Sequence, residues 1–336
     1  PTIGGILTQY LSWHWIFFIN IPVGIIAILL GAKVIPPSMT VKHTDRFDRA
    51  GAVLAFAGLA SLVFVVSEGS TFGWTSPVIL GMAALAIIAL AWFVRHELGS
   101  ADPLLDIRVF KNRNFILTNL LLFLVFFSLS GISYLLPFYL EYVHNYDTST
   151  AGLIMTSLSF AMMVAGLIAG VTFNRVGPRR LCILASIPLI LGYILMTQLH
   201  VHTSTGVVIL ALALIGFGLG LIGSPVTTMI MMGVSKAKAG MISSMTSLER
   251  TAPQSIGIAT FNAILIAGVV LIANSYDVTT KSPASIKMEV LSAGFDIAFI
   301  LSVVLGIVIM VISILVKEEI HPDYAADAKI LLKDSH

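Results

Sequence analysis

The polar and aromatic residues that could bind a small molecule lie inside long apolar segments of the sequence. One set recurs at steps of four and three residues, which places its members on one helix face: Asn119, Phe123, Phe127, Ser130 and Tyr134. Arg250 and Gln254 form a comparable face on a later segment. Such faces can line a cavity that holds an amphiphile by stacking and dispersion, although helix packing alone produces the same spacing. We treat these residues as a candidate substrate cavity.

Residue patterns that support catalysis are missing from the sequence. The chain contains no phosphate-binding glycine loop, no nucleophile elbow and no zinc-type ligand spacing. Carboxylates avoid the centres of the apolar segments, because Glu68, Glu141 and Asp296 stand at one end of their segments and Glu249 stands at the opposite end. The sequence therefore predicts no catalytic residue, no metal ion and no cofactor, and an enzyme is not expected.

The elements that must position the candidate residues follow from the composition. Of the 336 residues, 57% are hydrophobic and 11% are charged, whereas a soluble globular domain has about 25% charged residues. This balance excludes a water-soluble enzyme and points to the lipid bilayer, not to nucleic acid, as the partner. Cys182 is the only cysteine, so a disulfide within the chain is excluded.

The apolar residues group into stretches long enough to cross a membrane, which takes about 20 residues per helix. Nine complete spans are predicted, at residues 13–35, 50–68, 77–95, 115–139, 151–173, 181–199, 206–232, 251–274 and 293–316. The residues before Trp13 read as the end of a tenth apolar helix. Because Pro1 is not an initiator methionine, we expect an N-terminally truncated piece. The predicted fold class is all-α, a polytopic membrane protein.

The basic residues predict how these spans are oriented. With spans that alternate in direction, all 19 lysines and arginines except Lys281 and Lys287 fall on one side. The positive-inside rule makes that side cytoplasmic and places the C-terminus there, with residues 317–336 as a cytoplasmic tail. Two long polar connections, 36–49 and 96–114, bracket a hairpin of two spans.

Two motifs near the start of the chain resemble a known family. PTIGG is similar to the end of the antiporter signature GPxxGG, with Pro1, Gly4 and Gly5 as the matching residues. The string WHWIFFINIPVG resembles W-R-W-I-F-x-I-N-x-P-x-G, with these matching or replaced positions: Trp13, His14, Trp15, Asn20, Pro22 and Gly24. Both are motifs of the fourteen-span drug:proton antiporters of the EmrB/QacA type, in the major facilitator superfamily. His14 replaces the usual arginine, and Pro22 stands where a kink is tolerated.

A third motif lies in a predicted inner loop, GVTFNRVGPRR, and resembles the facilitator loop motif G-x-x-x-D-R-x-G-R-R. Its residues are Gly170, Asn174, Arg175, Gly177, Arg179 and Arg180. In the family, the acidic residue caps a helix N-terminus and pairs with arginine across the interface between the two halves. Asn174 replaces that acidic residue, so a weaker latch is expected; the three arginines also serve as topology determinants.

The resemblance implies a division of the chain. Residues 1–35 would be the end of an N-terminal six-helix bundle, with part of its fifth helix and all of its sixth. Residues 36–114 would be an inserted two-helix hairpin with its flanking loops, and residues 115–316 a C-terminal six-helix bundle. The family's proton-coupling carboxylates belong to N-terminal helices that this chain lacks.

The resemblance also implies a function, which is proton-coupled efflux of hydrophobic drugs or other small amphiphiles by alternating access. The transporter would be multi-pass in the cell membrane, with the proton gradient as its energy source. Its partners would be lipid, protons and a small-molecule substrate, and a periplasmic adaptor protein is left open. Two alternatives remain at this point: an exporter of one specific metabolite, siderophore or amino acid on the same fold, and an inactive truncated membrane fragment.

Overall fold

The computed structural model describes residues 1–34, 48–100, 103–200, 203–273, 283–319 and 321–324. Within these ranges the secondary structure is helical and contains no strand. Nine helical segments of the described residues are long and apolar enough to cross a membrane. The all-α fold class and the nine predicted spans are therefore confirmed.

The described helices follow one another along the chain. In order they are α1 (Thr2–Tyr10), α2 (Trp15–Phe18), α3 (Asn20–Val34), α4 (Arg49–Phe72), α5 (Pro77–Gly99), η1 (Ile107–Lys111), α6 (Arg113–Tyr142), α7 (Thr148–Val176), α8 (Pro178–Met196), α9 (Thr205–Met232), η2 (Lys236–Lys238), α10 (Ala239–Ala273) and α11 (Pro283–Leu315). The short helices η1 and η2 are 3₁₀ turns. Local sequence sets several of the boundaries. Asp48, Ser76, Asn112 and Asp147 each accept a hydrogen bond from a backbone N–H in the first turn of the helix that follows.

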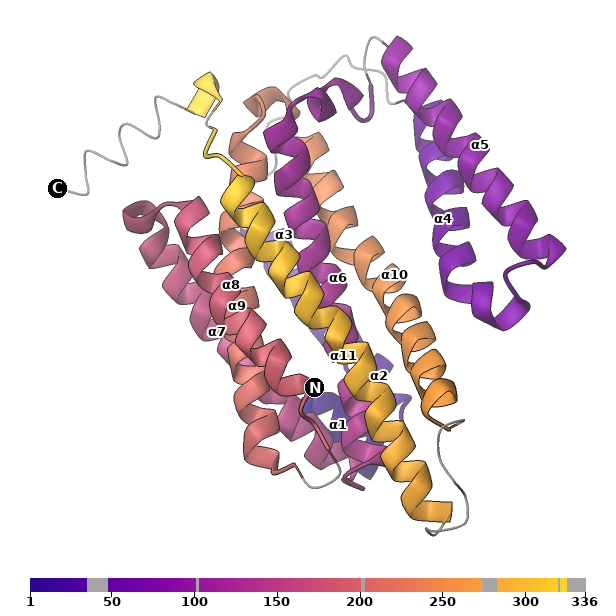
Figure 1. The fold of residues 1–336 in the computed structure, drawn as a ribbon. Coiled ribbons are helices and arrows are strands. Elements are labelled where there is room, and N and C mark those ends of the chain that lie inside the picture. Colours follow the sequence, from indigo (N-terminus) through magenta and orange to yellow (C-terminus); the bar gives the residue numbers. More distant parts are fainter. Residues whose placement is uncertain (35–47, 101–102, 201–202, 274–282, 320, 325–336) are drawn as a thin grey trace.

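Helices α6 to α11 pack into one bundle (Figure 1). Helix α9 packs against both α7 and α8, and α11 packs against α6, α8 and α10. Fully buried aromatic side chains fill the interior: Tyr139, Tyr193, Phe261, Phe295 and Phe299. Helix α1 lies against α7, while α4 and α5 form a hairpin that stands to one side and reaches the bundle through α4 and α10. The predicted division of the chain into units stays a prediction.

Helix α10 begins twelve residues before the span predicted to start at Thr251. The stretch before Thr251 is rich in serine and threonine. In the structure these hydroxyls donate to backbone carbonyls one turn earlier, as Ser244 does to Gly240 (3.1 Å) and Ser247 does to Ser243 (2.9 Å). Because the polar groups are satisfied within the helix, the helix continues through them. Glu249, which was predicted to stand at the end of its span, consequently lies inside α10, and so does Arg250.

Basic residues gather at one end of the bundle, at the starts of α6 and α8, the end of α7 and the η2 turn. We call this the cation-rich end, and its residues are Arg113, Arg175, Arg179, Arg180, Lys236 and Lys238. The segment 317–324 after α11 is tied to it. Asn114 exchanges two hydrogen bonds of 2.7 Å with the backbone of Lys317, and the His321 N–H donates to the Met232 carbonyl (2.8 Å). Asp323 accepts from the Ser235 hydroxyl (2.7 Å). This described part of the predicted tail is therefore packed, and residues 325–336 lie outside the described residues.

Candidate functional site

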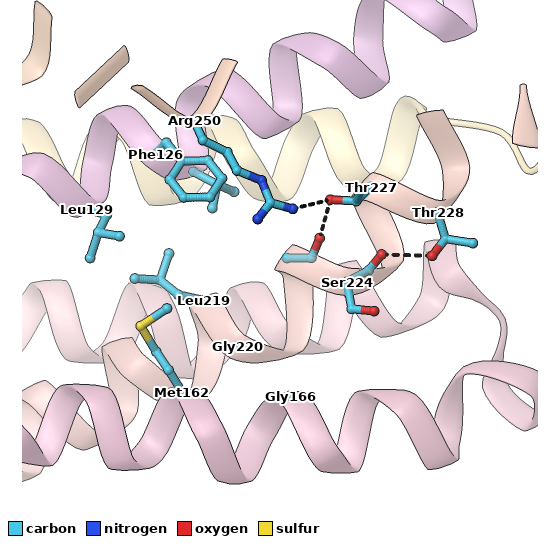
Figure 2. Close-up of a pocket in the computed structure, with 12 residues that line it drawn as sticks. Phe126, Leu129, Met162, Gly166, Leu219, Gly220, Ser224, Thr227, Thr228 and Arg250 are labelled. Carbon is cyan, nitrogen blue, oxygen red and sulfur yellow. Dashed lines mark hydrogen bonds between the residues drawn. The ribbon is translucent and has the colours of Figure 1, made fainter. Parts of the chain in front are cut away.

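Two cavities lie end to end along α6 and α7. The first has a volume of about 420 Å³, lies between α6, α7, α9 and α10, and contains Arg250; we call it the Arg250 cavity (Figure 2). The second has a volume of about 400 Å³, lies between α1, α6 and α7, and contains Gly152; we call it the Gly152 cavity. Leu129 and Met162 line both cavities. The two cavities are therefore adjacent, and we refer to them together as the groove.

Glycines in α9 create the wall of the Arg250 cavity. Gly216 and Gly220 are four residues apart on one face, and a Cβ at either position would overlap the backbone carbonyl of Leu158 or Met162 in α7. Close backbone approach through small residues is a common way to pack membrane helices. One turn later, Gly223 has no neighbouring atom within 4 Å of its Cβ position. Helix α9 therefore touches α7 at Gly216 and Gly220 and opens into the cavity beyond them.

Arg250 is the charged group of this cavity. Its Nη2 donates to the Thr227 hydroxyl (3.2 Å), and that hydroxyl donates to the Gly223 carbonyl (2.9 Å). The guanidinium carbon lies 5.6 Å from the centre of the Phe126 ring, and Figure 2 shows the side chain passing beside that ring toward Thr227. The described residues provide Arg250 with no carboxylate partner. An ionisable side chain on a membrane helix is uncommon, so one without an ion-pair partner is a functional candidate.

The predicted aromatic face of α6 lies against α10 and not in the groove. Phe127 packs on Phe261 with ring centres 6.0 Å apart, and the Tyr134 hydroxyl donates to Asn262 Oδ1 (3.3 Å). Ser130 contacts Gly257 so closely that a Cβ on the glycine would overlap its hydroxyl. Phe123 stacks on Phe127. Among the predicted cavity residues, Arg250 lines a cavity, and the others stay predictions as substrate contacts.

Asn119 and Gln254 are the two remaining residues of the predicted cavity. The Asn119 side chain is buried and donates to the Phe115 carbonyl (2.6 Å), while its Oδ1 has no hydrogen-bond partner. Gln254 is half-buried, one helical turn beyond Arg250 on α10. Neither residue lines the Arg250 cavity or the Gly152 cavity.

The face of α6 that does line the groove was missed by the sequence analysis. Its residues recur every fourth position: Val125, Leu129, Ser133, Pro137 and Glu141. A matching stripe on α7 contributes Gly152, Met155, Ser159, Met162 and Gly166. This face of α6 could have been identified from its polar residues and its proline, because serine, proline and glutamate recur there at steps of four residues. This face carries fewer aromatic residues than the face with Phe123 and Phe127, so it lacks the aromatic spacing on which the predicted cavity was based.

The PTIGG motif packs against α7 at the Gly152 cavity. A Cβ on Gly5 would lie 2.7 Å from the Thr148 carbonyl, and a Cβ on Gly152 would lie 2.9 Å from the Pro1 carbonyl. The Thr2 and Thr156 hydroxyls are hydrogen-bonded across the same contact. Gly4, by contrast, has no atom within 4 Å of its Cβ position. Within the described structure, Gly5 and Pro1 make this close contact and Gly4 does not.

The WHWIFFINIPVG string forms the α2–α3 break. Trp13 stacks on His14 with ring centres 3.9 Å apart, and Trp15 begins α2. Asn20 begins α3 and donates to the Ile16 carbonyl (3.0 Å), which bridges the two helices. The break comes at Ile19, before Pro22, because proline lacks an N–H and its ring crowds the carbonyl four residues earlier. Gly24 has no neighbour within 4 Å of its Cβ position.

The GVTFNRVGPRR motif ties the α7–α8 connection to the end of α11. Gly177 has a φ of +83°, which favours glycine, and it ends α7. The Arg179 N–H donates to Glu318 Oε1 (3.0 Å), and Arg179 Nη2 donates to the Ile314 carbonyl (2.6 Å). A carboxylate that follows α11 thus caps α8, whereas in the family's motif the capping carboxylate stands at the position that Asn174 occupies in this chain.

The other residues of this motif make no such tie. Arg175 and Arg180 are exposed, and Gly170 has no neighbour within 4 Å of its Cβ position. The side chain of Asn174 lies outside the described residues. The latch across two halves that the resemblance implies stays a prediction.

Replacing Asp106 with asparagine is expected to lower the thermal stability of the protein near pH 7. Asp106 forms an ion pair with Lys238, which joins the η1 turn before α6 to the η2 turn before α10. The hydrogen bond from Lys238 lowers the pKa of the Asp106 carboxyl. With a lowered pKa in the folded state, the stabilisation is complete above the ordinary aspartate pKa of about 4 and is lost as the pH falls through the lowered value.

Thermal unfolding of the wild type and Asp106→Asn across a pH series checks this. The gap between their unfolding midpoints should be constant from neutral pH down to about 4 and should shrink below that. A gap of the same size at all pH values would show that the asparagine acts through packing and not through the lost charge.

Comparison with known proteins finds a family match and several similar proteins. Residues 1–258 match the family model described as Major Facilitator Superfamily. The multidrug transporter protein MdtP of Bacillus subtilis is 31% identical over 268 residues, or 80% of this chain and 49% of that protein. The multidrug resistance protein Stp of Mycobacterium tuberculosis is 32% identical over 267 residues, with the same two shares covered. The riboflavin transporter RibZ of Clostridioides difficile is 31% identical over 265 residues, or 78% of this chain and 56% of that protein. The chain spans about half the length of these curated relatives.

Proposed function

The chain belongs to the Major Facilitator Superfamily, and from that premise we propose that it acts in proton-coupled efflux of hydrophobic drugs or other small amphiphiles. The observation that carries the proposal is the groove formed by the Arg250 and Gly152 cavities. Its lining is mostly apolar, with serine and threonine hydroxyls, one arginine at one end and one glutamate, Glu141, at the other. A lining of this kind suits ligands that differ in shape and share an apolar body with a polar group.

The proposed mechanism is alternating access, in which one bundle of helices rocks against another around a central site. The groove runs along α6 and α7, and α1 closes part of it through the Gly5–Gly152 contact. In this mechanism substrate and protons cross in opposite directions without a covalent step. The protein would lie in the cell membrane with its C-terminus in the cytoplasm, in keeping with the positive-inside rule. The fourteen-span subtype, the truncation and an adaptor partner stay predictions.

Two of the named relatives support drug efflux, since one is a multidrug transporter and the other a multidrug resistance protein. Efflux of ethidium from cells that express the complete gene tests the proposal. Cells with the gene should lose preloaded ethidium faster than cells without it, and a protonophore should remove the difference. Efflux that continues unchanged with the protonophore present would contradict proton coupling.

A second candidate function is export of one specific metabolite, which the relative named as a riboflavin transporter favours. The two functions predict different competition. A groove for many amphiphiles should let chemically unrelated compounds slow ethidium efflux, whereas a specific exporter should be slowed by one compound and its close analogues. Inhibition confined to one chemical series would replace the drug-efflux proposal with this one.

A further inference from the structure

The Arg250 guanidinium has more hydrogen-bonding capacity than the protein uses. A guanidinium carries five N–H donors, and Arg250 donates one described hydrogen bond, to Thr227. The Phe126 ring supports the guanidinium from the side, and the residue as a whole remains exposed. Figure 2 shows the guanidinium at the edge of the cavity, beside the Thr227 hydroxyl. Donors therefore remain available to a group that enters the cavity.

The charge around Arg250 is not balanced by the cavity itself. The other lining side chains are apolar or carry neutral hydroxyls, so Arg250 is the only ionisable residue among the described residues that line the cavity. No described carboxylate forms an ion pair with it. A group that binds beside the guanidinium gains most if it is an anion with two acceptor oxygens, since a carboxylate accepts a pair of hydrogen bonds from the guanidinium fork.

The two ends of the groove differ in charge, and this difference would orient a bound ligand. From Arg250 the lining continues along Val125, Leu129 and Met162, which are apolar and lead into the Gly152 cavity. The ionisable residue that lines that second cavity is Glu141, at the far end of α6. A negative head group is therefore attracted to the Arg250 end and repelled from the Glu141 end, while an apolar body fits between them.

We propose that the Arg250 cavity binds the anionic head group of an amphiphile, with the apolar body of the ligand lying along Leu129 and Met162. The inference rests on the proposed function, and it adds organic anions with an apolar body to the amphiphiles that the groove can hold. It assigns Arg250 to the ligand and not merely to the packing of α9 on α10.

The test compares three probes that share one fluorescent body, an undecyl chain with a dansylamino group, and differ at the head. The heads are a carboxylate, its methyl ester and a trimethylammonium group. Binding is measured by the dansyl emission with protein from the complete gene in nanodiscs of zwitterionic lipid. The wild type should bind the carboxylate about tenfold more tightly than the ester, as expected for one charged hydrogen-bonded pair, and the ammonium probe most weakly.

The variants separate a ligand contact from a structural role. Arg250→Gln should remove the preference for carboxylate over ester while ester binding stays as in the wild type, and Arg250→Lys should restore part of the preference because it keeps the charge. Arg113→Gln is the matched control, since it removes an arginine that lies at the cation-rich end of α6 and does not line either cavity. It should bind all three probes as the wild type does.

Several outcomes would overturn the proposal. Equal loss of binding for all three probes in Arg250→Gln, together with a lower unfolding midpoint, would assign the residue to packing. An unchanged preference would show that the anion binds elsewhere. If adding phosphatidylglycerol to the nanodiscs displaces the carboxylate probe, the anion site belongs to a lipid head group and not to a substrate. Ethidium efflux is scored separately, so loss of proton coupling with an intact carboxylate preference refutes the proposed function and leaves the site.

Discussion

Replacing Gly5 with valine is expected to reduce ethidium efflux by at least about tenfold, while the same replacement at Gly4 leaves efflux near the wild-type rate. The two glycines are neighbours in α1, but a Cβ at Gly5 would lie 2.7 Å from the Thr148 carbonyl and one at Gly4 meets no atom within 4 Å. A backbone carbonyl cannot rotate away as a side chain does. Valine at position 5 therefore forces α1 off α7.

The reciprocal replacement on α7 strengthens this test. Gly152→Val should have the same effect, since a Cβ there would lie 2.9 Å from the Pro1 carbonyl. Protein amounts in the membrane must be measured alongside efflux, because a variant that fails to accumulate says nothing about transport. Wild-type efflux by Gly5→Val at a wild-type protein level would show that transport does not require α1 to pack on α7 as the structure has it.

Replacing Gly220 with alanine is expected to lower the free energy of unfolding by about 2 kcal/mol, whereas Gly223→Ala is expected to be neutral or stabilising. Both residues lie in α9 and both changes add a single methyl group. At Gly220 that methyl overlaps the Met162 carbonyl of α7, while at Gly223 it points into open space. Alanine is otherwise the better helix former. The change in the free energy of unfolding at position 223 therefore reflects helix propensity, and the change at position 220 reflects the lost contact between α9 and α7.

The measurement is the midpoint of thermal unfolding of the purified variants in detergent. The two variants should move to opposite sides of the wild type, or Gly223→Ala should coincide with it. Equal destabilisation by both would mean that α9 does not approach α7 at Gly220 specifically. A drop at Gly223 alone would place the close contact one turn further along the helix.

Much of the helical architecture could be predicted because its signals are local. A run of about 20 apolar residues is enough to specify a membrane span, and such runs mark all nine spans that the structure confirms. The start of α10 was misplaced because serine and threonine are ambiguous. A serine or threonine hydroxyl can hydrogen-bond to water in a loop or to a backbone carbonyl of the preceding helical turn. The sequence does not indicate which of these acceptors is used.

The candidate site was predicted only in part, and the reason lies in the environment of the helices. In a water-soluble protein the polar face of a helix points outward and the apolar face points into the core, so the pattern reveals the orientation. In lipid both faces are apolar and this signal is lost. Sequence alone therefore identified the α6 stripe with Phe127 and Tyr134 as a special face without revealing its neighbour. The structure shows that this face meets α10, while the face with Leu129 and Ser133 meets the groove.

Arg250 illustrates what the sequence determines by itself and what depends on the tertiary structure. The sequence determined that a cation directly precedes the predicted span 251–274, because residue type and hydropathy are properties of the chain itself. It also determined the helical class, the spans and the family motifs. Only the tertiary structure decided that Arg250 lies inside α10 beside Thr227, and that Gly5 and Gly220 touch backbone while Gly4 and Gly223 do not. These contacts depend on which helices pack together and on their relative position along the helix axes. Both are determined by interactions between residues that are far apart in the chain.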